Sequence, residues 1–235
     1  MSLSERLQTV IGLCPDSECV ADIGTDHGFV PMALIEEGKA SRAVASDVGA
    51  APLQRALEHV ERAGLSEKIS LRLGDGLKTL SPGEADTVVI TGMGGLLIRK
   101  ILSESPEIVK KTKTLILSPQ SDIAEVRRFV SERGFLFEEE RMVFEDGKFY
   151  VIMRLKNSFQ SENPVKQTLS HEEMLYGPCL LRDRPAVFSA YLKRRRDTLA
   201  AIIASLSEED SSDAEKAREE KLREIKSIDG ILGSL

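Results

Sequence analysis

Short apolar stretches alternate with longer amphipathic ones from residue 19 to residue 155. The short stretches are rich in Val, Ile and Thr, as strands are. The longer stretches repeat apolar positions at helical spacing. The pattern therefore predicts strands over residues 19–23, 42–46, 69–73, 87–91, 114–117, 135–143 and 149–155, and helices over residues 32–37, 50–63, 96–102 and 123–133.

Alternating strands and helices are typical of a doubly wound α/β sheet. Only the turn Glu145-Asp146-Gly147-Lys148 separates the last two strands, so they form a hairpin and the sheet ends antiparallel. A parallel sheet with an antiparallel C-terminal hairpin matches the Rossmann-like class I methyltransferase sheet better than a dehydrogenase sheet. We expect this α/β domain over residues 1–156.

The pattern changes after residue 156. Residues 157–164 are polar and indicate a linker. Beyond them, positions spaced by three and four residues predict one seam of a long helix: Phe188, Leu192, Arg195, Leu199, Ile202 and Leu206. After an acidic turn over residues 207–212, a second stripe predicts a second helix: Ala214, Ala217, Leu222, Ile225, Ile228 and Leu232. We expect residues 157–235 to form a helical hairpin or coiled coil.

The first predicted strand ends in a turn that contains Gly24 and Gly28, and a helix follows. Glycines allow a sharp turn and close approach of a ligand to the backbone. A dinucleotide-binding loop reads G-x-G-x-x-G, whereas here Asp26 occupies the centre. A carboxylate at that position repels a pyrophosphate and suits a ligand with an amine or a sulfonium. The turn therefore favours S-adenosylmethionine over NAD.

Acidic residues also follow the next two strands, and open α/β sheets bind ligands at the carboxyl ends of their strands. Asp47 is placed to accept a hydrogen bond from a ribose hydroxyl. Asp75 could accept the exocyclic amine of adenine while Gly76 leaves space for the ring. Each could alone be a cap or a plain turn. Together with Asp22 they favour a nucleoside cofactor.

Thr91-Gly92-Met93-Gly94-Gly95 follows the fourth strand. Many amino-methylating enzymes carry an (Asp/Asn)-Pro-Pro-aromatic loop here, whose side-chain oxygen takes the target amine. This chain offers only the oxygen of Thr91. The glycines imply close approach of the main chain to the methyl donor or the acceptor, and Met93 either packs on a flat base or belongs to the core. Ser118-Pro119-Gln120 makes a polar rim at the same edge, to which the sequence assigns no role.

Two further features leave alternatives open. His27 lies beside Asp26 and either contacts the acceptor or is a solvated loop residue. Lys193-Arg194-Arg195-Arg196 is a basic block on the first tail helix. It either contacts the phosphates of RNA or pairs with acids of its own hairpin.

Composition narrows the class of protein. The chain has 235 residues and a formal net charge of −6, which argues against a protein that binds nucleic acid through a surface that is basic overall. No apolar run approaches the ~20 residues that span a bilayer. The three cysteines match no metal-ligand spacing. We expect a cytoplasmic protein without a metal or a membrane segment, and the oligomeric state stays open between monomer and homodimer.

With these motifs described, the chain resembles the bacterial tRNA (adenine-22-N1)-methyltransferase family. The likeness rests on residues 22–31, the glycine loop at 91–95 and Ser118-Pro119-Gln120, and it extends to residues 3–7 and to Tyr176-Gly177-Pro178. It implies a methyltransferase domain followed by a coiled-coil domain that helps to hold tRNA. By resemblance, Gly92 and Met93 fall on the loop that faces the acceptor, and the cofactor positions are Asp22, Gly24, Asp26, Asp47, Asp75 and Gly76. We expect Gly28 and Gly92 to contact the cofactor as well.

We therefore expect methyl transfer to N1 of an adenine in the D-arm of tRNA, with Asp26, His27 and Met93 as the candidate catalytic residues. The N1 lone pair needs no prior deprotonation, and Asp26 is the candidate that stabilises the developing positive charge. The principal alternative is a class I methyltransferase for a small molecule or a protein, with a tail used for oligomerisation. An NAD-dependent oxidoreductase and a non-catalytic adaptor are further alternatives.

Overall fold

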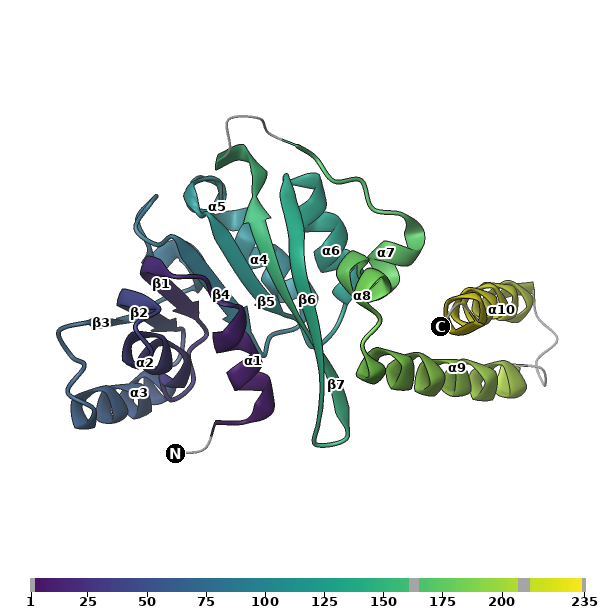
Figure 1. Ribbon diagram of the computed structural model, residues 1–235, viewed down its shortest axis with the longest axis horizontal. Coiled ribbons are helices and arrows are strands. Elements are labelled where there is room, and N and C mark those ends of the chain that lie inside the picture. The colour runs from purple at the N-terminus through teal and green to yellow at the C-terminus, as the bar shows by residue number, and fades with distance from the viewer. Residues whose placement is uncertain (1–2, 161–164, 207–211, 234–235) are drawn as a thin grey trace. The chain divides into compact units, whose positions relative to one another are not determined.

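A computed structural model describes residues 3–160, 165–206 and 212–233. Seven strands form one sheet in the order β3-β2-β1-β4-β5-β7-β6 (Figure 1). All of the predicted strands are confirmed, with ends that differ by three residues at most. Their bounds are β1 (Ser17–Ile23), β2 (Ala40–Asp47), β3 (Ile69–Leu73), β4 (Thr87–Thr91), β5 (Thr114–Ser118), β6 (Phe135–Glu145) and β7 (Lys148–Asn157).

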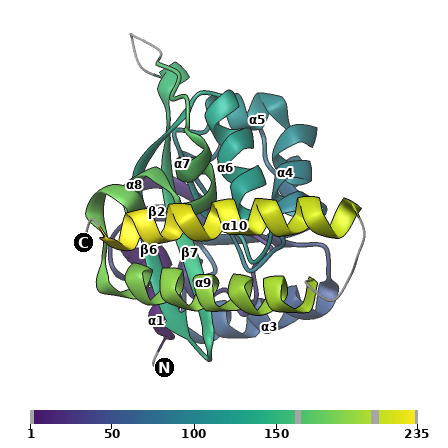
Figure 2. The same cartoon turned by 90° about the vertical axis from the view of Figure 1, so that its right-hand side faces the viewer.

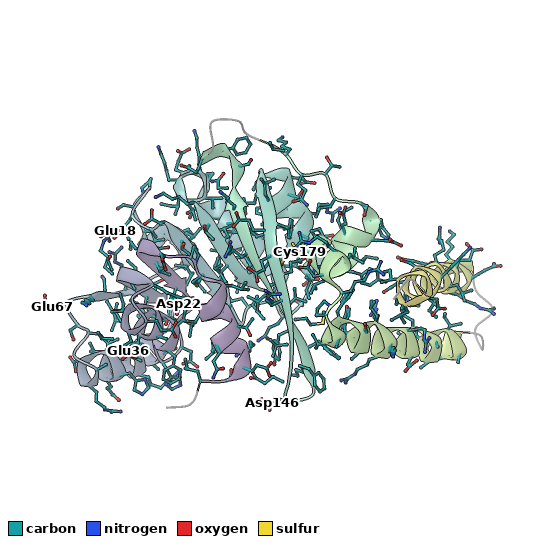
Figure 3. The ribbon with its side chains drawn as sticks, in the orientation of Figure 1. Glu18, Asp22, Glu36, Glu67, Asp146 and Cys179 are labelled. Atoms are coloured by element: carbon teal, nitrogen blue, oxygen red, sulfur yellow. The ribbon has the colours of Figure 1, made fainter. Side chains whose placement is uncertain are left out.

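The sheet is parallel from β1 to β5 and antiparallel at β7 and β6. This confirms the Rossmann-like methyltransferase topology. The hairpin turn is tight because Asp146 and Gly147 both take positive φ, 49° and 76°. That geometry matches the twist of the flanking strands. Figure 3 shows Asp146 at the tip of the hairpin.

Helices fill the connections between the strands. The four predicted helices are confirmed as α2 (Phe29–Glu36), α3 (Ala50–Arg62), α4 (Gly95–Glu104) and α6 (Ile123–Glu132). A short 3-10 turn, η1 (Gly76–Thr79), follows β3. The sequence analysis missed α1 (Glu5–Leu13) and α5 (Pro106–Lys111). The second of these has only 6 residues, which is too short to show a helical period.

The core lies against the central strands. Every residue of β5 is buried, and so are the middle residues of β1 and β4. Such fully buried strands are typical of parallel sheets with helices on both faces. In the structure α1 contacts α2, while α4 contacts α5 and α6, so the helices form two groups around the sheet (Figure 1).

The chain divides into two compact units, Met1–Cys179 and Leu180–Leu235. The first unit thus continues beyond residue 156, where the sequence analysis placed the end of the sheet domain. One reason is Asn157, whose side-chain nitrogen donates to the carbonyl oxygens of Val109 at 3.2 Å and Thr112 at 2.9 Å. These bonds cap the end of α5 and tie the last residue of β7, where the chain leaves the sheet, to the sheet domain.

A buried ion pair ties the last part of the first unit to the sheet. Arg127 of α6 donates to Glu140 of β6 at 2.9 Å, and both side chains are almost fully buried. Arg127 also donates to the carbonyl of Leu175 at 2.9 Å, and Glu140 accepts from the backbone N–H of Cys179 at 3.0 Å. A Cβ on Gly177 would lie 2.3 Å from Glu140, so only glycine fits there. These contacts hold α7 (His171–Tyr176) against α6.

The second unit is helical, as expected. It contains α9 (Ala186–Leu206) and α10 (Ser212–Gly233), which lie side by side (Figure 2), and α8 (Pro178–Asp183) crosses the boundary between the units. The buried apolar side chains of this pair are Phe188, Leu192, Leu199, Ile228 and Ile231. Residues 207–211 of the expected turn, and the side chains of Leu206 and Ala214, lie outside the described residues.

The prediction for the second apolar stripe is wrong at one residue. Leu222 is 47% exposed, while Lys221 and Glu224 are partly buried. Glu224 lies toward α9 because it pairs with Arg195 at 2.8 Å. A charged pair therefore occupies part of the seam where the apolar spacing alone predicted leucine.

We expect that Arg127→Met lowers the free energy of unfolding by about 3–5 kcal/mol, because it leaves the Glu140 carboxylate buried without its cation. Urea denaturation monitored by circular dichroism measures this. The control is Arg128→Met, which removes an exposed partner of Glu125 and should leave the stability almost unchanged. Adding Glu140→Leu to Arg127→Met should restore much of the stability. A loss no larger than that of the control would contradict the buried-pair argument.

Candidate active site

The strand register brings the predicted residues to one edge of the sheet. Ile23 of β1 is paired with Ser46 of β2 and with Ile90 of β4. Asp47 is paired with Leu73 of β3, and Thr91 of β4 is paired with Ser118 of β5. The turns that follow β1, β2, β3, β4 and β5 therefore leave the sheet at the same edge, where α/β folds bind ligands.

The turn after β1 is tied to β2 and lies against the turn after β4. The backbone N–H groups of Gly24 and Thr25 both donate to the carbonyl of Ser46, at 2.8 and 2.9 Å. Gly24 has φ +77°, and a Cβ on it would lie 2.1 Å from the terminal methyl of Met93. The backbone angle therefore favours glycine here, and any larger residue would also have to displace the Met93 methyl.

Asp22 lies at the end of β1 and is 5% exposed (Figure 3). Burial raises the pKa of its carboxyl from 3.8 to about 6, because a charge is costly away from water. The Thr25 hydroxyl lowers this pKa and Asp47 raises it further. The sheet edge therefore holds a carboxylate that a cationic ligand would stabilise.

Asp26 is the exposed acid of the same turn. Its carboxylate is 65% exposed and accepts a hydrogen bond from Arg55 of α3 at 2.9 Å. His27 Nε2 lies 3.4 Å from the same oxygen. Asp26 thus points to solvent beside the sheet edge while one of its oxygens is held by a guanidinium.

His27 belongs to a stack of three rings rather than to free solvent. Its ring lies 5.2 Å from that of Phe29 and 5.4 Å from that of His59, measured between centroids. His59 Nδ1 is also 2.9 Å from the carbonyl oxygen of His27, which takes φ +63°. This left-handed backbone is uncommon for a residue with a side chain, so the stack and the hydrogen bond support it.

The sequence analysis missed Arg55 and His59. The two lie four residues apart on α3, which places them on the same face of that helix. That spacing could have indicated from the sequence that the two side chains lie together. The sequence does not indicate that this face is directed toward the turn after β1, because that depends on how α3 packs.

Asp47 and Asp75 end their strands as expected. One carboxylate oxygen of Asp47 accepts from the backbone N–H of Gly49 at 2.6 Å. Asp75 is exposed and pairs with Lys78 at 2.8 Å, and that hydrogen bond lowers the pKa of its carboxyl. Gly76 has φ +57°, and a Cβ on it would lie 2.9 Å from Ile101 of α4. Packing on α4 is therefore one reason for this glycine.

The turns after β4 and β5 are joined through their backbones. Gly92 donates to the carbonyl of Ser118 at 3.3 Å, and Gln120 donates to that of Met93 at 2.9 Å. Gly95 donates to Ser121 at 3.0 Å. The Ser118-Pro119-Gln120 segment, for which no role was predicted, thus lies in direct contact with the glycine loop.

The basic block lies in the second unit, on α9. Arg195 pairs with Glu224 of α10 at 2.8 Å, and Arg196 lies 3.4 Å from Asp229 of α10. The alternative of pairing within the hairpin is therefore confirmed for these two residues. Lys193 and Arg194 are exposed on the same helix.

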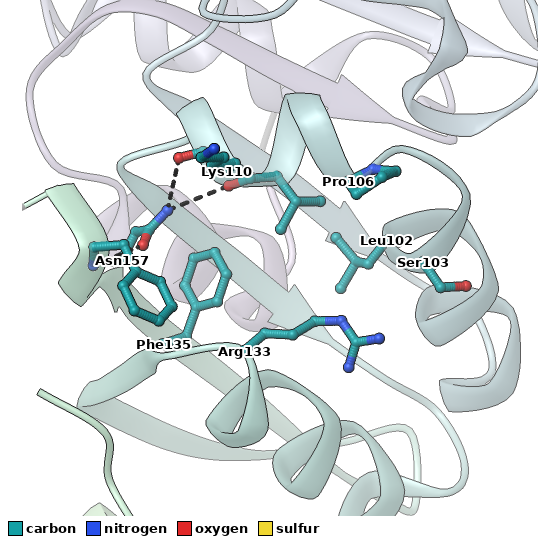
Figure 4. A pocket seen from close by; sticks show the side chains of 9 residues that line it. Leu102, Ser103, Pro106, Lys110, Arg133, Phe135 and Asn157 are labelled. Carbon is teal, nitrogen blue, oxygen red and sulfur yellow. Dashed lines mark hydrogen bonds between the residues drawn. The ribbon is translucent and has the colours of Figure 1, made fainter. Parts of the chain in front are cut away.

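A separate cavity of about 450 Å³ lies away from the sheet edge described above. Figure 4 shows Arg133 and Phe135 on one side of it and Leu102 and Pro106 on the other. These residues come from the end of α4, from α5 and from the start of β6. None of the residues predicted for the site lines this cavity.

The remaining expectations concern metals, membranes and thiols. Within the described ranges, no group of three His, Cys, Asp or Glu side chains could hold a metal ion. No described helix is long and apolar enough to cross a membrane. Cys14, Cys19 and Cys179 are buried thiols, and burial raises the pKa of Cys14 to about 12.

Comparison with known proteins places this geometry in a family. A family model described as tRNA (adenine(22)-N(1))-methyltransferase matches residues 20–228. The tRNA (adenine(22)-N(1))-methyltransferase of Bacillus subtilis is 33% identical over 225 residues, which cover 96% of this chain and 93% of that protein.

Solved structures of similar proteins match this chain across the residues of both units. A Streptococcus pneumoniae protein in complex with S-adenosyl-L-methionine has a TM-score of 0.86 and 29% identity, and the match covers 98% of this chain and all of that one (100%). The M. capricolum enzyme with S-adenosyl-homocysteine has a TM-score of 0.84 and 26% identity, with coverage of 98% and 100%.

We expect Asp22→Asn to stabilise the protein at neutral pH. The folded-state pKa of about 6 lies above the ordinary 3.8, so ionisation of Asp22 opposes folding, and its cost develops as the pH rises from about 4 to above 6. The variant should gain about 2–3 kcal/mol over the wild type at pH 7.5 and little at pH 4. Urea unfolding at both pH values measures the difference, and an equal effect at both would contradict the prediction.

Proposed function

The chain belongs to the tRNA (adenine(22)-N(1))-methyltransferase family, and on that premise we propose how its residues divide the work. The enzyme uses S-adenosyl-L-methionine to methylate N1 of adenine 22 in tRNA. The proposal rests chiefly on one observation. Acids and glycines from the turns after β1, β2, β3 and β4 meet at one sheet edge, and the exposed carboxylate of Asp26 lies beside them.

The residues at the sheet edge fit this cofactor. Gly24 leaves the backbone open to close approach, and Asp22 offers a buried negative charge that a cation would stabilise. The hydroxyl of Ser46 is buried without a hydrogen-bond partner among the described residues. This hydroxyl can therefore form a hydrogen bond with a ligand at the sheet edge. When bound, S-adenosyl-L-methionine supplies a methyl group on a sulfonium. We assign its binding to Asp22, Gly24, Asp26, Gly28, Asp47, Asp75, Gly76 and Gly92.

Asp47 and Asp75 serve the nucleoside half in this assignment. A carboxylate at the end of the second strand suits the ribose hydroxyls. The carboxylate of Asp75 suits the exocyclic amine of adenine, and its lowered pKa keeps it ionised as an acceptor. Gly28 begins α2 with φ +70° and lies close to Ala56, so it lets the turn pack on α3.

The acceptor base lies against the loop at 91–95 in our proposal. N1 of adenine has an in-plane lone pair, so no residue needs to remove a proton from it. The enzyme must hold N1 in line with the methyl group, and orientation of this kind supplies about 7–11 kcal/mol of the barrier. Met93 provides an apolar surface for the base, and His27 lies beside Asp26 at the same rim.

Asp26 stabilises the positive charge that methylation places on the base. Its exposure leaves it accessible to the acceptor, and Arg55 and the His27 turn fix its position. The base is stacked in folded tRNA and has to swing out to reach this carboxylate, which costs a few kcal/mol. Contacts between the tRNA phosphates and the basic block offset that cost. Because the substrate is tRNA, we place the enzyme in the cytoplasm.

We expect Asp26→Asn to lower kcat by about 10-fold to 100-fold with tRNA affinity unchanged, because it removes a charge that acts mainly in the transition state. Transfer of labelled methyl to unmodified tRNA, with N1-methyladenosine quantified by mass spectrometry, measures kcat. The control is Glu58→Gln, which removes an exposed carboxylate from α3. Unchanged turnover in Asp26→Asn would remove this residue from the mechanism.

We expect replacement of the four basic-block residues by Gln to weaken tRNA binding at least 10-fold. The slope of log K against log salt should become shallower by about 2–4, since each lost phosphate contact removes about one unit. Filter binding at several salt concentrations measures both. The control replaces four cations of α10 by Gln: Lys216, Arg218, Lys221 and Arg223. Equal losses in the two variants would contradict a role specific to the block.

A further inference from the structure

The reaction leaves only part of the target base available for recognition. N1 lies on the Watson–Crick edge of adenine, and this edge has to face the methyl donor. The exocyclic N6 amine, which borders the Watson–Crick edge, and the ring nitrogen N7 form the adjacent Hoogsteen edge. A carboxamide reads that edge with two hydrogen bonds, one accepted from N6 and one donated to N7. A residue that recognises adenine during the reaction is therefore expected to carry a carboxamide beside the acceptor loop.

The loop at 91–95 carries no carboxamide of its own, but its neighbour does. Gln120 follows β5 and is exposed, and its side-chain nitrogen lies 3.9 Å from the position of a Cβ on Gly92. The buried Pro119 precedes it. The carboxamide thus lies beside Gly92, the exposed glycine of the loop, where solvent can reach the main chain.

The backbone around Gln120 is held to the acceptor loop at three points. Gln120 donates to the carbonyl of Met93, Gly92 donates to that of Ser118 and Gly95 donates to that of Ser121. A Cβ on Gly95 would lie 2.5 Å from the Ser121 carbonyl oxygen, so the two turns are in close contact. The position of the Gln120 backbone relative to Met93 is therefore fixed by main-chain contacts and does not depend on flexible side chains.

We propose that Gln120 is the residue that selects adenine, by accepting a hydrogen bond from N6 and donating one to N7 of the target base. Guanine presents an oxygen in place of the N6 amine, so the carboxamide oxygen would face another acceptor. The proposal deepens the function above, because it rests on the loop at 91–95 facing the acceptor. It assigns a specificity role to the Ser118-Pro119-Gln120 segment.

The test combines a change in the enzyme with a change in the base. One tRNA carries adenosine at position 22, and a second carries 7-deazaadenosine, in which a C–H replaces N7. Single-turnover methylation of both is measured with the wild type, with Gln120→Leu and with the control Gln160→Leu. Gln160 is exposed and donates to the carbonyl of Lys110 on α5. Any difference in intrinsic N1 reactivity between the two bases is the same for all three proteins, so it cancels in the comparison.

The wild type and Gln160→Leu should methylate the 7-deaza tRNA about 10-fold more slowly than the adenosine tRNA, while Gln120→Leu should treat both tRNAs alike. Gln120→Leu should also be about 10-fold slower than the wild type on the adenosine tRNA. Its affinity for S-adenosyl-homocysteine and for tRNA should stay unchanged, because neither depends on the Hoogsteen edge.

Two results would overturn the proposal. If Gln120→Leu remains as sensitive to the loss of N7 as the wild type, another residue reads that edge. If the wild type methylates both tRNAs at the same rate, the enzyme does not recognise the base through N7. In both cases methylation of adenosine tRNA continues, so the proposed function stands. Failure of the wild type to methylate the adenosine tRNA would instead contradict the proposed function.

Discussion

The site depends on one close contact, between the backbone of Gly24 in the turn after β1 and the side chain of Met93 in the turn after β4. Gly24 leaves no space for a side chain under the methyl group of Met93, and its N–H is held by the carbonyl of Ser46. This contact brings the turn that offers the cofactor acids against the loop that offers the acceptor surface. Because interiors are close-packed, a shift in either turn moves the other. Methyl transfer requires both ligands to be positioned to within a fraction of an ångström, and this contact supplies the coupling.

The electrostatics of the edge follow from how its two acids are placed. Asp22 is buried, so its negative charge destabilises the protein in the absence of a cation. Binding of a cationic ligand would remove part of this destabilisation. Asp26 is exposed, and one of its carboxylate oxygens accepts a hydrogen bond from Arg55. Its negative charge therefore destabilises the protein little and can interact with a positive charge that forms on a neighbouring ligand. In our proposal this difference in burial gives the binding role to Asp22 and the catalytic role to Asp26, four residues further along the chain.

Periodicity allowed the strands and the longer helices to be predicted, because each reflects burial of its own residues. The contacts between distant segments could not be predicted in this way. Arg127 meets Leu175 and Glu140 through folding of the whole first unit, so the sequence offered no reason to extend that unit to Cys179. The pairing of Glu224 with Arg195 likewise displaced Leu222 from the seam. At the site, glycine and aspartate positions were visible as motifs, whereas the ring stack on His27 required the packing of α3.

The ion pairs of the basic block do not oppose a role in holding tRNA. Arg196 and its partner Asp229 are 42% and 52% exposed, and a pair exposed on both sides contributes only about 0.2–1 kcal/mol. A phosphate can therefore replace an acid of α10 at small cost, while the release of counterions from the RNA provides a larger gain. In the absence of tRNA the same acids keep the arginine side chains ordered on α9, which lowers the entropy lost when they bind. In our proposal, pairing within the hairpin and binding of RNA are two alternative states of the same side chains, and the balance between them depends on the salt concentration.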